Sequence, residues 1–259
     1  MITAPFPTLS SILCLMAFMV TFTCAVQSET SAQVLKTGEG SVVAQSMSTE
    51  RANPDRSERA RRLVIFFHGI RSRGSVMESL GNSWSLVLPD TKFVSPDAPF
   101  ANSARGREWF IVDDQVMRPD RIEAARRAFD DMVSGIVKRE GFEKDLKNVA
   151  FVGVSQGAIV ALDAVTTGRW KVGAIVSFAG LLPLPPTSSS RDTAILLMHG
   201  GADRTIPFAA SVAAESQLEA AGYDVTYKLF PGVGHTISSE EAEQAAVFLR
   251  KRWANAVRG

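Results

Sequence analysis

Short, continuous apolar runs alternate with amphipathic helical patterns along the chain from residue 61 onward. A run without polar positions, such as LVIFF at Leu63–Phe67, is typical of a strand that is buried on both faces of a sheet. The strands expected on this basis are Leu63–Phe67, Phe93–Ser95, Val149–Val154, Ala174–Phe178, Ala194–Met198 and Val225–Phe230.

Helices are expected between most of these strands. Pro119 suits the first turn of a helix, where its missing N–H costs nothing, and apolar residues then recur at helical spacing to Arg139. Ser238 and Glu241 have the spacing of a capping box at the start of a final helix. The expected helices are Pro119–Arg139, Gln156–Thr167, Phe208–Ala221 and one from Ser238 through Trp253.

This alternation predicts an α/β fold, with a mostly parallel central sheet and helices on both of its faces. Ligands of such sheets bind at the carboxyl ends of the strands. We therefore expect the functional residues directly after the strands.

The residues before this domain differ in character. Ile12–Val26 is apolar but shorter than the roughly 20 residues that a membrane span needs, so we expect no stable span. It fits the core of a secretory signal peptide with cleavage near Ala25, which predicts export to the periplasm or the medium. No Lys or Arg precedes Lys36, so a start at Met47 and a cytoplasmic protein is the alternative. The expected organisation is a signal segment at 1–26, a polar linker at 27–60 and a folded domain at 61–259.

Composition excludes several classes of function. The net charge is +1, which leaves no basic excess to neutralise phosphates, so no nucleic-acid partner is expected. Cys14 and Cys24 both precede the folded domain, which therefore has no disulfide, no cysteine-ligated zinc and no thiol nucleophile. Only three histidines occur, and a multi-histidine metal site would need nearly all of them.

A Gly-x-Ser-x-Gly motif at 153–157 follows one of the expected strands and precedes a helix. This is the context of a nucleophile elbow, in which a sharp turn exposes the serine hydroxyl and only residues without a bulky Cβ fit on either side. We predict Ser155 as the nucleophile. The alternative is a tight strand-to-helix turn whose serine simply faces solvent.

A serine needs a base, and the base needs a carboxylate that fixes its tautomer. His235 lies in a Gly-rich loop after the last strand, and Asp203 follows the strand before it. Taken alone, His235 is equally consistent with an inert loop histidine, and Asp203 with an Asx-turn or a helix N-cap. The order Ser155, Asp203, His235 is that of α/β-hydrolases. His68 and His199 end strands, and we expect their rings to bond nearby backbone.

The oxyanion of an acyl-transfer reaction needs hydrogen-bond donors. The backbone N–H of Gln156, directly after the serine, is one expected donor. The second is the backbone N–H of Ile70, in the turn that follows the first strand.

These residues together resemble the phospholipase/carboxylesterase family of α/β-hydrolases, which includes acyl-protein thioesterases and small bacterial carboxylesterases. The resemblance extends from about Leu63 to Trp253. The motifs that carry it are FFHGI (Phe66–Ile70), GREWF (Gly106–Phe110), VGVSQGA (Val152–Ala158), HGGADRTIP (His199–Pro207) and GVGH (Gly232–His235).

The resemblance implies an α/β-hydrolase fold without a large cap domain and a Ser-His-Asp esterase that uses no metal or organic cofactor. The substrate would be a small-molecule ester or thioester. Trp109 and Phe110 would line or brace the acyl pocket, unless they only fill the core under a long loop. One departure is that basic residues, Arg71 and Arg73, follow Ile70 where the family often has an acidic residue.

Two other functions fit the same pattern of residues. A peptidase could use the same fold and triad, although the chain has no large insertion that would form the usual cap. A non-catalytic binding protein could retain the pocket, but such proteins usually lose a member of the triad.

Overall fold

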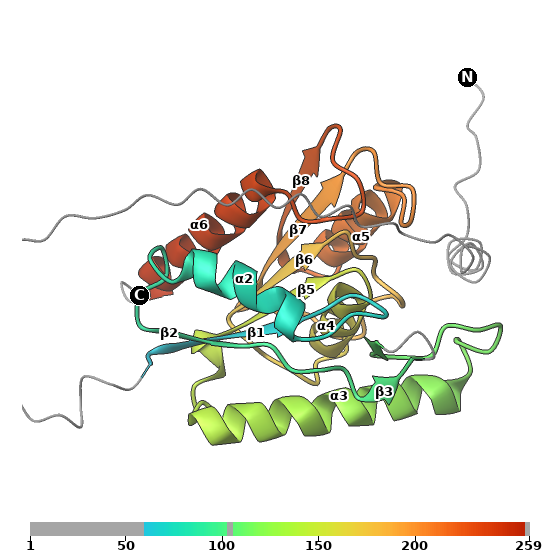
Figure 1. The fold of residues 1–259 in the computed structure, drawn as a ribbon, viewed down its shortest axis with the longest axis horizontal. Coiled ribbons are helices and arrows are strands. Elements are labelled where there is room, and N and C mark those ends of the chain that lie inside the picture. Colours follow the sequence, from blue (N-terminus) through green and yellow to red (C-terminus); the bar gives the residue numbers. More distant parts are fainter. Residues whose placement is uncertain (1–59, 103–105, 257–259) are drawn as a thin grey trace, which may run out of the picture.

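The computed structural model describes residues 60–102 and 106–256. Within them, six strands form one fully parallel sheet in the order β2-β1-β5-β6-β7-β8 (Figure 1). The strands of this sheet are β1 (Arg62–Phe67), β2 (Thr91–Val94), β5 (Val149–Val154), β6 (Ala174–Phe178), β7 (Ala194–Gly200) and β8 (Asp224–Phe230).

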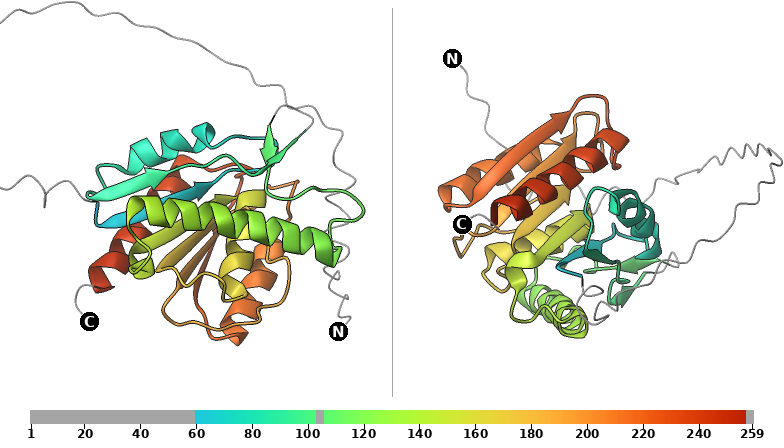
Figure 2. Two further views of the ribbon diagram at one scale, coloured as in Figure 1. Left: turned by 90° about the horizontal axis from the view of Figure 1, so that it is seen from below. Right: turned by 90° about the vertical axis from the view of Figure 1, so that its left-hand side faces the viewer.

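Helices cover both faces of the sheet (Figure 2). One face packs against α3 (Pro119–Glu140), α4 (Gln156–Thr166) and α5 (Ala209–Ala220). The other face packs against α2 (Ser75–Trp84) and α6 (Ser239–Ala256). The central strands are buried because both of their faces are covered, which explains their uninterrupted apolar sequences.

The expected α/β architecture is confirmed, and every expected strand and helix is present with ends within three residues of the prediction. The capping box at the start of α6 is also confirmed. The Glu241 backbone N–H donates to Ser238 Oγ at 3.2 Å, and the Ser238 N–H donates to the Glu241 carboxylate at 2.8 Å.

Three elements were not predicted. They are α2, the short 3₁₀ helix η1 (Leu146–Asn148) and a two-stranded antiparallel hairpin of β3 (Phe100–Ala101) and β4 (Arg107–Glu108). The hairpin matters for the site, because Trp109 and Phe110 follow directly from β4.

The predicted signal segment at 1–26, and residues 27–59 of the predicted linker, lie outside the described residues. Among the residues that the structure does describe, no helix has the length and apolar character needed to cross a membrane.

Candidate active site

Ser155 lies in a strained turn between β5 and α4. Its backbone angles are φ 53° and ψ −121°, a region that residues other than glycine rarely adopt. A Cβ at Gly153 would lie 2.5 Å from Ala158 backbone atoms, and one at Gly157 would lie 2.1 Å from the carbonyl oxygen of Phe67. The motif therefore needs both glycines so that the strand and helix can meet at this angle.

His235 connects Ser155 to Asp203. Its Nδ1 lies 2.7 Å from Asp203 Oδ2, and its Nε2 lies 2.9 Å from Ser155 Oγ. A carboxylate only accepts, so Nδ1 carries the proton and Nε2 is the acceptor for the serine hydroxyl. The three residues are distant in sequence, yet the fold brings them together at the carboxyl ends of β5, β7 and β8.

Close backbone packing brings the Asp203 and His235 loops together. A Cβ at Gly200 would lie 2.2 Å from the carbonyl oxygen of Val233, so only glycine permits the contact. The Ala202 N–H donates to the same carbonyl at 2.9 Å, and the Gly201 N–H donates to Phe230 O at 2.9 Å. The distance between the carboxylate and the imidazole is thus fixed by main-chain contacts.

The Asp203 carboxylate is buried and fully hydrogen-bonded. Oδ1 accepts the backbone N–H groups of Thr205 at 2.8 Å and Ile206 at 3.0 Å, which is an Asx-turn. Oδ2 accepts from His235, so one side chain forms both the turn and the contact with the imidazole. Burial acts to raise the pKa of Asp203, but hydrogen bonds from His199 and His235 outweigh it and hold the pKa well below its usual value.

His199 makes one contact that was expected from the sequence and others that were not. As expected, its ring bonds nearby backbone, since Nε2 donates to the carbonyl oxygen of Ile206 at 2.8 Å. The same Nε2 also lies 3.3 Å from Asp203 Oδ2, and Nδ1 lies 2.7 Å from the Ser211 hydroxyl. His199 has no exposed surface and therefore acts behind Asp203, away from solvent.

The turn after β1 lies beside the serine. A Cβ at Gly69 would be in ordinary contact with Ser155 Cβ at 3.6 Å. His68 shapes this turn, because its Nε2 accepts the Ala98 N–H at 3.0 Å and its Nδ1 donates to Gly69 O at 2.7 Å. Burial lowers the pKa of His68, in keeping with this neutral tautomer. Within the described residues, the N–H groups of Ile70 and Gln156 have no protein acceptor.

The Gln156 side chain holds the segment after β4 in place. Its Oε1 accepts the Trp109 N–H at 2.7 Å, and its Nε2 donates to the Phe110 carbonyl at 2.7 Å. The two aromatic residues then diverge. Phe110 lines a cavity of about 340 Å³ beside α4, whereas Trp109 is outside it.

Trp109 packs in the core, with 1% of its surface exposed, against Phe67 and Phe129. Its Nε1 donates to the carbonyl oxygen of His68 at 2.8 Å. Trp109 therefore does not line this cavity, and its contacts fit the expected role of a brace. The physical reason is that the chain turns after β4 and directs consecutive side chains to opposite sides.

This parallel sheet, with a serine in a strained strand-to-helix turn and a histidine and aspartate after later strands, defines the protein as an α/β-hydrolase. A family model described as phospholipase/carboxylesterase matches residues 52–253. The chain belongs to that family.

Similar proteins agree with this assignment. Esterase YpfH of Escherichia coli K12 is 32% identical over 202 residues, which cover 76% of this chain and 85% of the relative. Acyl-protein thioesterase 1 of Gibberella zeae is 28% identical over 218 residues, covering 73% and 89% of the two chains. The crystal structure of esterase PE8 matches with a TM-score of 0.69 and 31% identity, over 75% of this chain and 94% of the other.

Proposed function

We propose that the protein hydrolyses carboxylic esters and thioesters through an acyl-enzyme intermediate formed on Ser155. The observation that carries the proposal is the 2.9 Å contact between His235 Nε2 and Ser155 Oγ, with Asp203 2.7 Å from the other ring nitrogen. This arrangement provides a nucleophile, a base and a group that orients the base. The family and its esterase and thioesterase members support the same reaction.

In the first half of the reaction, Ser155 Oγ attacks the acyl carbon while His235 Nε2 takes the hydroxyl proton. The imidazolium that forms is stabilised by the buried carboxylate of Asp203. Collapse of the tetrahedral intermediate breaks the bond to the leaving oxygen or sulfur, which receives the proton from His235. The acyl group remains on Ser155 as an ester.

In the second half, water attacks this ester while His235 removes a proton from the water. The carboxylic acid leaves, and the proton returns to Ser155 Oγ. No metal or organic cofactor is needed in this sequence, because the imidazole carries every proton that moves.

We assign the oxyanion hole to the backbone N–H groups of Ile70 and Gln156. Gln156 follows the nucleophile directly, and the turn that contains Ile70 lies beside Ser155, since a Cβ at Gly69 would be 3.6 Å from Ser155 Cβ. Donors that are fixed before the reaction stabilise the developing charge without reorganising, which makes them effective in catalysis. Loss of one such donor typically lowers kcat about 100- to 1,000-fold.

Active-site labelling tests the proposed function. A fluorophosphonate probe is expected to modify the wild-type protein once, and to leave the Ser155→Ala variant unmodified. A non-catalytic binding protein would leave both unmodified. Assays of matched amides and esters then separate a peptidase from an esterase, and we expect turnover of esters and thioesters only.

We further propose that the protein is exported and that residues 1–26 form the signal. The apolar run Ile12–Val26, with small residues near Ala25, supports cleavage in this region. The intact mass of protein isolated from its own cells tests this. Loss of about the first 25 residues is expected, whereas a chain that starts at Met1 or Met47 would contradict export by cleavage.

A further inference from the structure

A mostly apolar cavity of about 340 Å³ runs beside α4. Its lining comes from α3, α4 and the loops around residues 110–117 and 181–184. Ile159 and Leu181 line it, and both belong to a buried cluster against which Phe110 packs. Ile159 is one helical turn from Ser155, and its N–H donates to the Ser155 carbonyl at 3.1 Å.

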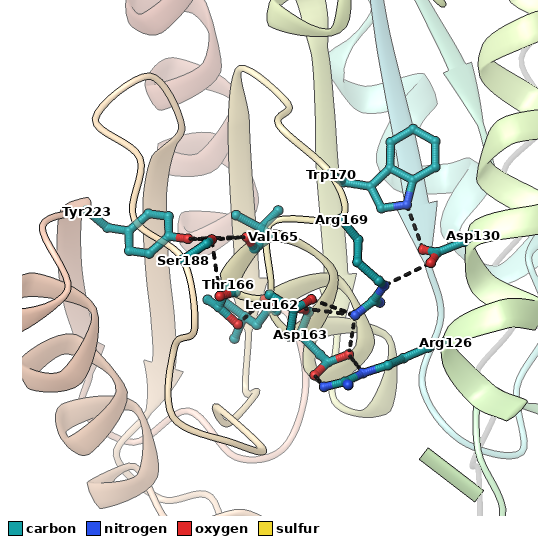
Figure 3. Close-up of polar contacts among 11 residues, drawn as sticks. Arg126, Asp130, Leu162, Asp163, Val165, Thr166, Arg169, Trp170, Ser188 and Tyr223 are labelled. Atoms are coloured by element: carbon teal, nitrogen blue, oxygen red, sulfur yellow. Dashed lines mark hydrogen bonds and ion pairs between the residues drawn. The ribbon is translucent and has the colours of Figure 1, made fainter. Parts of the chain in front are cut away.

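Near the C-terminal end of α4, the charged residue Asp163 lines the cavity. Asp163 lies eight residues after Ser155 in sequence, which corresponds to about 12 Å along a helix that rises about 1.5 Å per residue. Arg126 of α3 holds this carboxylate with two hydrogen bonds of 2.7 and 2.9 Å, and Arg169 contacts it at 2.9 Å (Figure 3). All three side chains line the cavity.

The charges at this end are matched. Arg169 Nε also donates to Asp130 at 2.8 Å, and the Trp170 indole N–H donates to the same carboxylate at 2.7 Å (Figure 3). Two arginines and two aspartates thus form a network without net charge, which we call the ion network (Arg126, Asp130, Asp163 and Arg169). Because its charges are balanced, it offers an anionic substrate group little attraction.

We propose that Arg126, Asp163 and Arg169 close the far end of an acyl-chain pocket and so limit the length of the acyl group that the protein accepts. This inference rests on the proposed function, since it places the acyl carbon at Ser155. Each methylene group of the acyl chain that enters the apolar part of the cavity leaves water without breaking a polar contact of the protein. A chain that reaches the ion network must separate hydrogen-bonded charges, which is costly in a half-buried site.

The distance gives the expected limit. An extended alkyl chain with C–C bonds of about 1.5 Å advances about 1.25 Å per carbon, so about 12 Å accommodates roughly eight to ten carbons. Burial of one methylene corresponds to about a fourfold gain in binding. We therefore expect kcat/KM to rise about fourfold per methylene up to acyl chains of roughly eight to ten carbons, and to fall beyond them.

The experiment measures kcat/KM for p-nitrophenyl esters with acyl chains of increasing length, each below its critical micelle concentration. Arg126→Ala opens the far end and leaves Asp163 paired with Arg169. This variant is expected to shift the optimum to acyl chains at least two carbons longer. The matched control is Arg127→Ala, which removes the neighbouring arginine, an exposed side chain that pairs with Glu123 and is not among the cavity residues. It should keep the wild-type profile.

A folded Arg126→Ala variant with the wild-type optimum would overturn the inference while leaving the proposed function intact. If circular dichroism shows that this variant does not fold, Ile159→Phe decides, because the larger side chain fills the cavity near Ser155. Its optimum must then move to shorter chains, and an unchanged optimum overturns the inference. Absence of all ester hydrolysis in the wild type would overturn both proposals.

Discussion

His199 and His235 both approach the same oxygen of Asp203. Oδ2 lies 3.3 Å from His199 Nε2 and 2.7 Å from His235 Nδ1. His235 faces the serine, whereas His199 is fully buried behind the carboxylate. We therefore predict that His199 is a positioning residue, which acts on the reaction through Asp203.

Replacement of His199 tests this role. In His199→Phe, Asp203 loses one donor and its pKa rises relative to the wild type, so it binds a proton at a higher pH. We expect kcat/KM to fall about 10- to 150-fold, since a hydrogen bond to a charged group is worth about 1.5–3 kcal/mol. The acid limb of the pH profile should also move to higher pH.

His199→Gln is the conservative control, because its amide N–H can still donate. It should recover part of the activity and return the acid limb toward that of the wild type. If His199→Phe lowers kcat/KM equally at every pH, the residue contributes only to folding and the positioning role is wrong.

Asp203 should also make stability depend on pH. Its pKa is depressed in the folded state, so its ionised form stabilises the protein above its unfolded pKa near 3.8. This contribution is lost as the pH falls below that value. Urea unfolding of the wild type and of Asp203→Asn should therefore give a difference in unfolding free energy that is constant above about pH 5 and narrows in more acidic solution. A difference that widens with acid would contradict the assignment.

The two glycines of the elbow should tolerate no side chain. In Gly157→Ala the new Cβ would lie 2.1 Å from the Phe67 carbonyl, and strand β1 would have to move. We expect a loss of about 1–3 kcal/mol in the free energy of unfolding, together with loss of activity.

Gly135→Ala is the matched control for this substitution. Gly135 lies within the C-terminal half of α3, and a Cβ there meets nothing within 4 Å. Helix propensity predicts a gain of about 0.5–1 kcal/mol at unchanged activity. Thermal unfolding should give a lower Tm for Gly157→Ala and a higher Tm for Gly135→Ala than for the wild type. Shifts of both Tm values in the same direction would contradict the role of close packing at Gly157.

The central strands could be predicted because burial on both faces requires apolar residues at every position, as in Leu63–Phe67. The helix α2 could not, because its buried positions include Gly81, which carries no apolar signal. Gly81 allows close packing, since a Cβ there would make a tight contact of 3.2 Å with the Phe66 ring. This contact joins α2 to β1, and the local sequence does not show that these two segments pack together.

The serine, histidine and aspartate could be predicted because each follows a strand, and the ends of parallel strands converge. Asp203 showed that two interpretations of one residue can both hold, because its two oxygens form different contacts. The second contact of His199 was hidden, since it depends on how the loop after β7 folds back on the ring. The sequence could not separate the role of Trp109 from that of Phe110, because sequence order does not show which side of a turn a side chain takes.

The cavity beside α4 could not be predicted from the sequence either, because residues of α3, α4 and two loops line it. One signal was available. Asp163 is the single charged residue in the mostly apolar segment QGAIVALDAVT, and a buried charge requires partners. No sequence pattern identifies Arg126 and Arg169 as those partners, because they lie in other segments of the chain.

Steady-state hydrolysis of a short-chain p-nitrophenyl ester by Ser155→Ala, compared with the wild type, is the most direct test of the contact between His235 and Ser155. The variant should keep its circular dichroism spectrum and lose at least about 10⁴-fold in kcat. The double variant with His235→Ala should be scarcely worse, because the two side chains act as a unit. A folded Ser155→Ala protein with kcat within tenfold of the wild type would contradict the account.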